Sequence, residues 1–265
     1  MNMIELDGLT RSFGALVAVD DVSLSIRAGE IFGLLGPNGA GKTTVIKMLT
    51  TLLPPSGGVA RVAGFDVAHQ SARVRAEIAY VPQLVSADGA LTASENLRLF
   101  AKLYGVCRRE IGSRVDDALR FVGLGDSADR VVRGYSGGMV RRLELAMALI
   151  HRPRVLFLDE PTVGLDPLAR QAVWQQVRQL VKQFGMTILL TTHLMEEADS
   201  LCDRVAIMKR GHVTTTGSPG ELKAALGLPD ATLDDVFAHH SGEQLESEGN
   251  FREISKSRRS IARLG

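Results

Sequence analysis

The stretch Gly36-Pro37-Asn38-Gly39-Ala40-Gly41-Lys42-Thr43 decides the fold of this chain. It fits the pattern G-x-x-x-x-G-K-[ST] of a phosphate-binding loop. The mostly apolar segment 30–35 before it predicts a buried strand, and apolar residues at helical spacing after Lys42 predict a helix. The alternative is a glycine turn beside a surface lysine, but a chance match in a chain of this length has a probability of only about 1%. The strand, loop and helix together predict a nucleotide-binding α/β domain.

Each residue type in this loop suits a polyphosphate. Glycines let backbone N–H groups approach the phosphates, and the following helix presents the positive end of its dipole. Lys42 adds a positive charge for the β- and γ-phosphates, and the Thr43 hydroxyl is placed to bind Mg²⁺. The residues expected to bind nucleotide are Gly36, Pro37, Asn38, Gly39, Ala40, Gly41, Lys42, Thr43 and Thr44.

A second element, Val155-Leu156-Phe157-Leu158-Asp159-Glu160, puts two carboxylates directly after four apolar residues. A buried strand delivers such residues to the carboxyl edge of the sheet, where ligands bind in α/β proteins. Asp159 can hold Mg²⁺ together with Thr43, and Glu160 can orient or deprotonate the attacking water. Alone, the pattern also fits a strand that ends in a solvated turn. Beside a phosphate loop, it predicts a hydrolytic site.

The remaining pattern alternates strands and helices. Strands are predicted at 4–9, 17–26, 30–35, 155–158, 187–191 and 204–209, and helices after Lys42 and at 93–104, 111–122, 137–150, 167–183 and 194–200. Gly105 and Gly123 are expected at the ends of two of these helices. The alternation predicts an α/β domain with a largely parallel sheet, into which a helix-rich segment at about 93–134 is inserted.

Composition excludes several classes of protein. The 265 residues are 45% hydrophobic and 23% charged, as in ordinary globular proteins, which argues against a disordered chain. Apolar runs are far shorter than the ~20 residues of a membrane-spanning helix, and the first residues carry no secretory signal. The net charge of +1 does not favour a nucleic-acid-binding protein. Cys107 and Cys202 are too few for a disulfide framework and have no partners at metal-binding spacing.

From about residue 4 to 241, the chain resembles the ATP-binding subunits of ATP-binding-cassette (ABC) transporters. The motifs that carry the resemblance are Tyr135-Ser136-Gly137-Gly138-Met139 (signature), Gln83 (Q-loop), Gly164-Leu165-Asp166 (D-loop), His193 (switch histidine) and Phe13 (adenine-stacking aromatic). Their order along the chain is that of the family. The residues also allow plainer interpretations: Ser136 and Asp166 as helix caps, Gln83 as a surface amide, His193 as a structural histidine and Phe13 as a core residue.

The resemblance implies a phosphate-loop NTPase fold with a mainly parallel core sheet, an N-terminal antiparallel β subdomain and a helical signature subdomain at about 93–150. The ABC domain would extend over residues 1–240, followed by a polar, mobile tail at 241–265. The implied ligands are ATP and Mg²⁺, with Thr43, Gln83 and Asp159 at the metal. Lys42, Glu160 and His193 are the implied catalytic residues.

The resemblance also implies a head-to-tail dimer. In it, Ser136, Gly137 and Gly138 of one copy contact the γ-phosphate bound by the other, and Asp166 can bridge to the partner's phosphate loop. The signature departs from the commoner Leu-Ser-Gly-Gly-Gln form at Tyr135 and Met139. Methionine cannot hydrogen-bond a ribose as glutamine can, so this one contact is not expected.

The form Tyr-Ser-Gly-Gly-Met followed by Arg141 and Arg142 resembles one subgroup, the drug-resistance exporters of the daunorubicin type. Glu95-Asn96-Leu97, Leu103-Tyr104-Gly105 and the segment 232–237 add to this resemblance. It implies an ATPase on the cytoplasmic face of the cell membrane that works with a separate multi-span permease. The implied cargo is a drug-like compound, a lipid or a polysaccharide.

Three other functions compete with this one. A soluble ABC ATPase that acts on DNA or ribosomes usually has two cassettes or a long coiled coil, and neither is visible here. A regulatory module with an inactive site is the second alternative. The intact Lys42, Asp159, Glu160 and His193 argue against it. The ATPase of an importer shares all these motifs.

Two further segments have plain interpretations. Glu196, Glu197 and Asp199 are expected to form an acidic, solvated helix face. The tail combines apolar Phe251, Ile254, Ile261 and Leu264 with basic residues, which fits a frayed basic tail or a helix on an acidic membrane surface.

Overall fold

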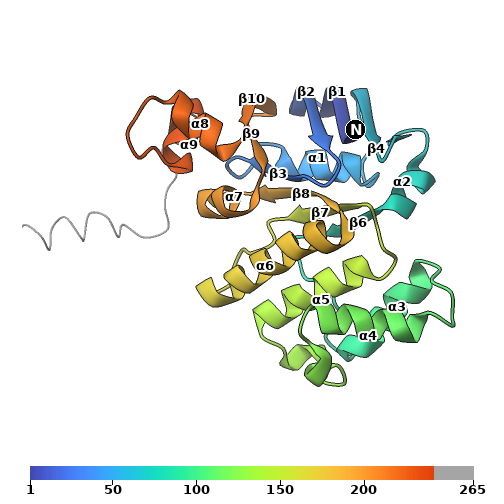
Figure 1. Ribbon diagram of the computed structural model, residues 1–265. Helices are drawn as coiled ribbons and strands as arrows, with labels where there is room; N and C mark the ends of the chain where they lie inside the picture. The colour runs from blue at the N-terminus through green and yellow to red at the C-terminus, as the bar shows by residue number, and fades with distance from the viewer. Residues whose placement is uncertain (242–265) are drawn as a thin grey trace, which may run out of the picture.

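Two β-sheets organise residues 1–241, the part of the chain that the computed structural model describes (Figure 1). The first is an antiparallel sheet of order β2-β1-β4-β5 and the second has six strands in the order β10-β9-β3-β8-β7-β6. In the second sheet all strands run parallel except β10. The strands are β1 (Asn2–Phe13), β2 (Leu16–Arg27), β3 (Ile31–Leu35), β4 (Gly57–Val62), β5 (Phe65–Asp66), β6 (Ile78–Val81), β7 (Val155–Asp159), β8 (Thr187–Thr192), β9 (Arg204–Lys209) and β10 (His212–Gly217).

Both faces of the six-stranded sheet are covered, so its central strands are buried along their whole length. Alternate residues of each strand enter different hydrophobic clusters: Phe157 and Leu189 pack on one face, Leu158 and Leu190 on the other. Helix α1 (Lys42–Leu49) packs with the first cluster. Helices α5 (Gly137–Leu149) and α6 (Pro167–Phe184) pack with the second. Figure 1 shows α1 and α5 on opposite sides of the sheet.

The inserted segment forms a helical layer next to α6 (Figure 1). It contains α3 (Ala93–Leu103), α4 (Ile111–Phe121) and two short 3₁₀ turns, and α5 follows it in the same layer. Thr92 and Glu95 form a capping box at the start of α3, and Ser136 caps α5. Gly105 and Gly123, with φ of 69° and 64°, follow the ends of α3 and α4, as predicted. The fold class predicted from the sequence is confirmed.

Several short elements were not predicted from the sequence. They are strands β4, β5, β6 and β10 and helices α2 (Ser71–Glu77), α8 (Pro219–Ala225) and α9 (Leu233–Ser241). Strand β6 has only four residues, and β10 is rich in threonine and partly exposed along its length. Strands β6 and β4 pair with the distant β7 and β1, so no local pattern indicates them. Strands β10 and β5 pair with their sequence neighbours β9 and β4 but are short or partly exposed. The predicted tail lies outside the described residues from residue 242 onward.

Within residues 1–241, no helix combines the length and the apolar character needed to cross a bilayer. The expectation of a solvated acidic face on α7 (Met195–Leu201) is correct for two residues and wrong for Glu197. Glu196 and Asp199 are exposed and pair with Arg170 and Lys223. Glu197 is only 1% exposed and accepts hydrogen bonds from Thr162 Oγ1 (2.7 Å) and Trp174 Nε1 (3.0 Å). This buried carboxylate ties α7 to α6 and to the segment that follows Glu160.

Candidate nucleotide site

The phosphate loop connects β3 to α1 along a path that requires glycine at its last position. Gly41 immediately precedes α1 and has φ 104°. A Cβ atom there would lie 2.5 Å from the carbonyl oxygen of Ala18 in β2, which no side chain tolerates. The loop is also anchored by a hydrogen bond from Gly211 N to Ala40 O (3.0 Å). The loop therefore has one defined shape, which leads straight into α1.

Lys42 is buried at the start of α1 and its side chain lies across the loop. Its Nζ donates to the carbonyl oxygens of Gly36 (2.7 Å) and Pro37 (3.1 Å) and lies 3.7 Å from Glu160 Oε1. Burial lowers the pKa of Lys42, and the carboxylates of Glu160 and Asp159 oppose that shift. The ammonium group is thus held between the loop and the acidic end of β7.

Asp159 ends β7 within a set of oxygen atoms. It accepts hydrogen bonds from Thr43 Oγ1 (3.2 Å) and Thr191 Oγ1 (2.6 Å), and the Tyr80 hydroxyl lies 3.5 Å away. Burial and the charge of Asp159 raise the pKa of Tyr80 to about 12, so that this phenol stays neutral. A carboxylate beside a threonine hydroxyl is a hard-oxygen donor set of the kind Mg²⁺ prefers. The chemistry of these residues fits the predicted metal.

Glu160 brings together the predicted catalytic residues. Its Oε1 lies 3.2 Å from His193 Nδ1 as well as 3.7 Å from Lys42, and its Oε2 accepts from Gln83 Nε2 (3.1 Å). The residue has a left-handed backbone with φ 48°, which costs roughly 1–3 kcal/mol for a residue other than glycine. Two hydrogen bonds from its N–H, to the carbonyl and the hydroxyl of Thr191, hold it in place (both 3.1 Å).

The signature residues do not belong to this cluster. Ser136 and Gly137 are exposed at the start of α5, and Ser136 Oγ accepts from Met139 N (3.3 Å). Gly138 is buried, and a Cβ there would lie 2.7 Å from Ala169 Cβ, so glycine is also needed for α5 to pack on α6. The predicted helix-cap role of Ser136 is thus confirmed, and the hydroxyl proton is left available for donation.

Two other predicted residues make their contacts outside the Glu160 cluster. Asp166 caps α6 by accepting from Leu168 N (3.0 Å) and Ala169 N (2.9 Å), as one of its two interpretations required. Phe13 is 46% exposed at the end of β1, beneath the guanidinium of Arg11, which is 4.7 Å from the ring centroid. The alternative of a core phenylalanine is therefore wrong, and stacking on adenine stays a prediction.

A buried ion pair beside the site was not anticipated from the sequence. Arg141 and Glu144, one turn apart on α5, are 2.9 Å apart and almost fully buried. Arg141 also donates to the carbonyl oxygens of Pro82 (2.9 Å) and Gln83 (3.2 Å), and Glu144 accepts from the N–H and hydroxyl of Ser86. The pair fastens the signature helix to the loop that carries Gln83. The only signal in the sequence was an Arg and a Glu three residues apart on an otherwise apolar helix face.

The fold and the site define a phosphate-loop NTPase. The sequence profile of the family described as "ABC transporter" matches residues 19–163. The chain is 47% identical to the daunorubicin/doxorubicin resistance ATP-binding protein DrrA of Streptomyces peucetius, over 92% of this chain and 74% of that protein. It is 39% identical to the linearmycin resistance ATP-binding protein LnrL of Bacillus subtilis, over 85% and 72% of the two chains. It is 47% identical to the Nod factor export ATP-binding protein I of Sinorhizobium fredii, over 83% and 64%.

Solved structures agree with these relatives. A structure of an ATP-binding subunit of an ABC transporter superposes with a TM-score of 0.79 at 31% identity, covering 89% of this chain and 98% of the other. The chain belongs to the ABC transporter family. It is an ATPase whose hydrolysis of ATP is coupled to transport.

The buried pair on α5 gives a testable prediction. Replacing Glu144 with alanine leaves the buried guanidinium of Arg141 without its counter-charge and the N–H of Ser86 without its acceptor. We expect the free energy of unfolding, measured by urea titration, to fall by about 3–5 kcal/mol. The matched control is Glu196→Ala, which removes an exposed carboxylate and should change stability by no more than about 0.5 kcal/mol. Equal stabilities of the two variants would contradict a structural role for the pair.

Proposed function

We propose that this chain is the ATPase subunit of an exporter and that it works with a separate membrane-spanning permease. The observation that carries the catalytic part is the contact of one buried carboxylate, Glu160, with Lys42, His193 and Gln83. These residues follow three parallel strands and the phosphate loop, so they meet at one edge of the sheet.

In this proposal the phosphates of ATP lie on the loop at the start of α1, where free N–H groups and Lys42 neutralise their charge. Mg²⁺ held by Thr43, Asp159 and Gln83 would neutralise further charge on the phosphates. Glu160 orients and deprotonates the attacking water, and His193 beside it donates to the γ-phosphate. Since phosphoryl transfer depends on positioning, the two hydrogen bonds that fix the backbone of Glu160 matter as much as its charge.

The signature residues serve a second copy of the chain. Lys42 begins a helix on one face of the six-stranded sheet, and Ser136 begins a helix on the opposite face. Ser136 and Gly137 are exposed and present a hydroxyl and a helix N-terminus to an anion. A head-to-tail dimer would place them on the γ-phosphate of the partner's ATP.

The loop after Gln83 is suited to receive the permease. Leu84 and Val85 are exposed immediately after Gln83. Leu99 and Leu103 are exposed one turn apart on α3. This helix is joined to the loop through a hydrogen bond from Asp88 N to Asn96 Oδ1 (2.8 Å). A permease bound here could shift Gln83 and, through it, Glu160. The chain would then lie at the cytoplasmic face of the membrane, bound through its partner.

Export, rather than import, is favoured by the relatives. One is named for resistance to daunorubicin and doxorubicin, one for resistance to linearmycin and one for export of Nod factor. We propose a drug-like compound, a lipid or a polysaccharide as cargo, selected by the permease. No nucleic acid is expected as a partner, since the net charge is +1.

The role of Glu160 is tested by Glu160→Gln, which keeps the shape of the side chain but removes the base. We expect ATP turnover to fall by about 10²–10⁴-fold while ATP is still bound. Hydrolysis and nucleotide binding are measured on the purified chain. Glu196→Gln is the control and should turn over ATP like the wild type. Full turnover by Glu160→Gln would remove Glu160 from its proposed role.

The proposed docking surface for the permease consists of the exposed Leu84, Val85, Leu99 and Leu103. It is tested by Leu103→Glu. A charge in an apolar interface is costly to bury, so this variant should no longer co-purify with the membrane protein that the wild type retains. ATP hydrolysis by the isolated chain should be unchanged, because Leu103 is 70% exposed. Leu228→Glu, at another exposed leucine, should still co-purify. If Leu103→Glu retains the membrane protein as the wild type does, docking at this surface is contradicted.

A further inference from the structure

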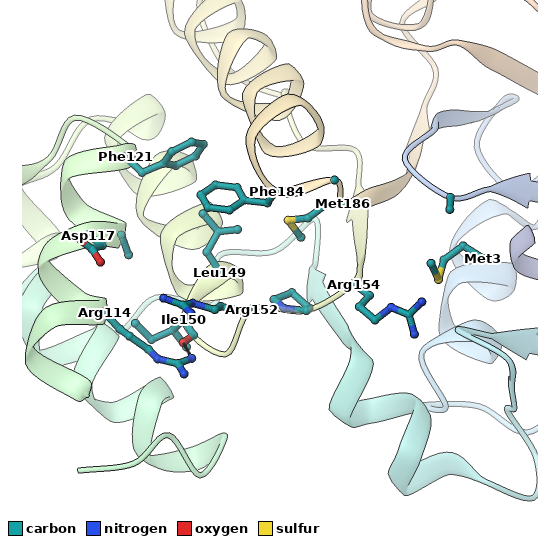
Figure 2. Close-up of a pocket in the computed structure, with 14 residues that line it drawn as sticks. Met3, Arg114, Asp117, Phe121, Leu149, Ile150, Arg152, Arg154, Phe184 and Met186 are labelled. Carbon is teal, nitrogen blue, oxygen red and sulfur yellow. Dashed lines mark hydrogen bonds between the residues drawn. The ribbon is translucent and has the colours of Figure 1, made fainter. Parts of the chain in front are cut away.

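A cavity of about 540 Å³ lies at the edge of the six-stranded sheet opposite to the nucleotide site (Figure 2). Its walls come from α4, the end of α5, the turn between α6 and β8, and the turn before β3. The segments Arg152 to Arg154 and Gly185 to Met186, which lead into the amino ends of β7 and β8, form part of its lining. The nucleotide site is at the carboxyl ends of the same strands, so the two sites are separate.

One side of the cavity is apolar and partly aromatic. The rings of Phe121 and Phe184 meet edge to face with centroids 5.5 Å apart. Leu149 and Met186 lie beside them, as Figure 2 shows. Phe184 is 56% exposed. Exposure of a large aromatic ring to water is unfavourable, and a bound ligand that covered the ring would remove that exposure. A flat ring system would find a matching surface here.

The other side of the cavity carries excess positive charge. Three arginines, Arg114, Arg152 and Arg154, line the cavity together with a single carboxylate, Asp117, so the charged lining residues carry a net charge of +2. Asp117 pairs with Arg120 (3.0 Å), a residue outside the lining, and Arg114 pairs with Glu110 (2.7 Å). Arg154 Nη1 lies 3.8 Å from Glu77 Oε2, a long ion pair. Guanidinium groups recognise carboxylates and sulfonate-like oxyanions with paired hydrogen bonds.

We propose that this cavity binds an aromatic organic anion, a ring system that carries a carboxylate or sulfonate group. The volume lies within the range of about 300–1,000 Å³ that is typical of small-molecule sites. The rings of Phe121 and Phe184 contact the aromatic body, and Arg152 binds the anionic group. This assignment is independent of the proposed transport function.

The cavity lies where a bound ligand would contact elements that lead to the ATP site. Helix α5 extends from Leu149 at the cavity to the signature residues at its other end. Strand β7 leads from Arg154 to Asp159, and β8 leads from Met186 toward His193. A ligand that bridges α4 and these strand starts therefore contacts the helical layer and the sheet at once. It would change the rate of ATP turnover without occupying the nucleotide site.

The test uses 8-anilinonaphthalene-1-sulfonate, an aromatic sulfonate whose fluorescence rises in apolar sites, titrated into the purified full-length chain. We expect saturable binding by the wild type, about tenfold weaker binding by Arg152→Gln and by Phe184→Ala, and binding that persists with excess ATP. Matched controls are Arg210→Gln, since Arg210 is also an exposed arginine in a turn with left-handed φ (47° against 57° for Arg152), and Leu228→Ala. Both controls should bind like the wild type.

Two outcomes would overturn the assignment. Wild-type affinity in both Arg152→Gln and Phe184→Ala would show that the probe binds elsewhere. Displacement of the probe by ATP would place it in the nucleotide site. Because Arg152 and Phe184 are exposed, neither substitution removes a core residue, and an unchanged urea midpoint confirms that the variants are folded.

Discussion

The geometry of the site depends on the contacts that converge on one buried carboxylate, that of Glu160. Lys42, His193 and Gln83 follow different strands and are brought to this one group. That meeting requires a fixed register of the parallel sheet: Leu158 opposite Val81 and Asp159 opposite Thr191. A slip of one residue in β7 would turn its side chains to the other face and remove both carboxylates from the site. The buried cores on both faces of the sheet prevent such a slip.

Thr191 shows how the sheet positions the two acidic residues of the site. Its hydroxyl donates to Asp159, and the same hydroxyl, together with the Thr191 carbonyl, accepts from the N–H of Glu160. A single residue of β8 thereby orients both acidic residues, for which different roles are proposed. Glu160 itself has a left-handed backbone, with φ 48°. The cost of that conformation is offset by contacts that only the completed sheet supplies.

Those parts of the structure that are continuous in the sequence could be predicted from it. The phosphate loop, the acidic end of β7 and the cap of α5 are each a short run with a local physical reason. Glu197 and the Arg141–Glu144 pair could not be predicted, because their burial depends on what folds over them: Trp174 in one case, and the loop from Pro82 to Ser86 in the other. Gly138 is an intermediate case. The signature motif identifies this glycine, but only the structure shows that it is also needed for packing, because Ala169 approaches it closely.

The central claim is that each ATP site is shared by two copies of the chain, with Lys42 from one and Ser136 from the other. It is tested most directly by mixing two separately inactive variants, Lys42→Ala and Ser136→Ala, and measuring ATP hydrolysis. A mixed head-to-tail dimer contains one site in which both residues are intact, so the mixture should regain turnover that neither variant has alone. If both residues act within a single chain, the mixture stays as inactive as its components, and the shared site is contradicted.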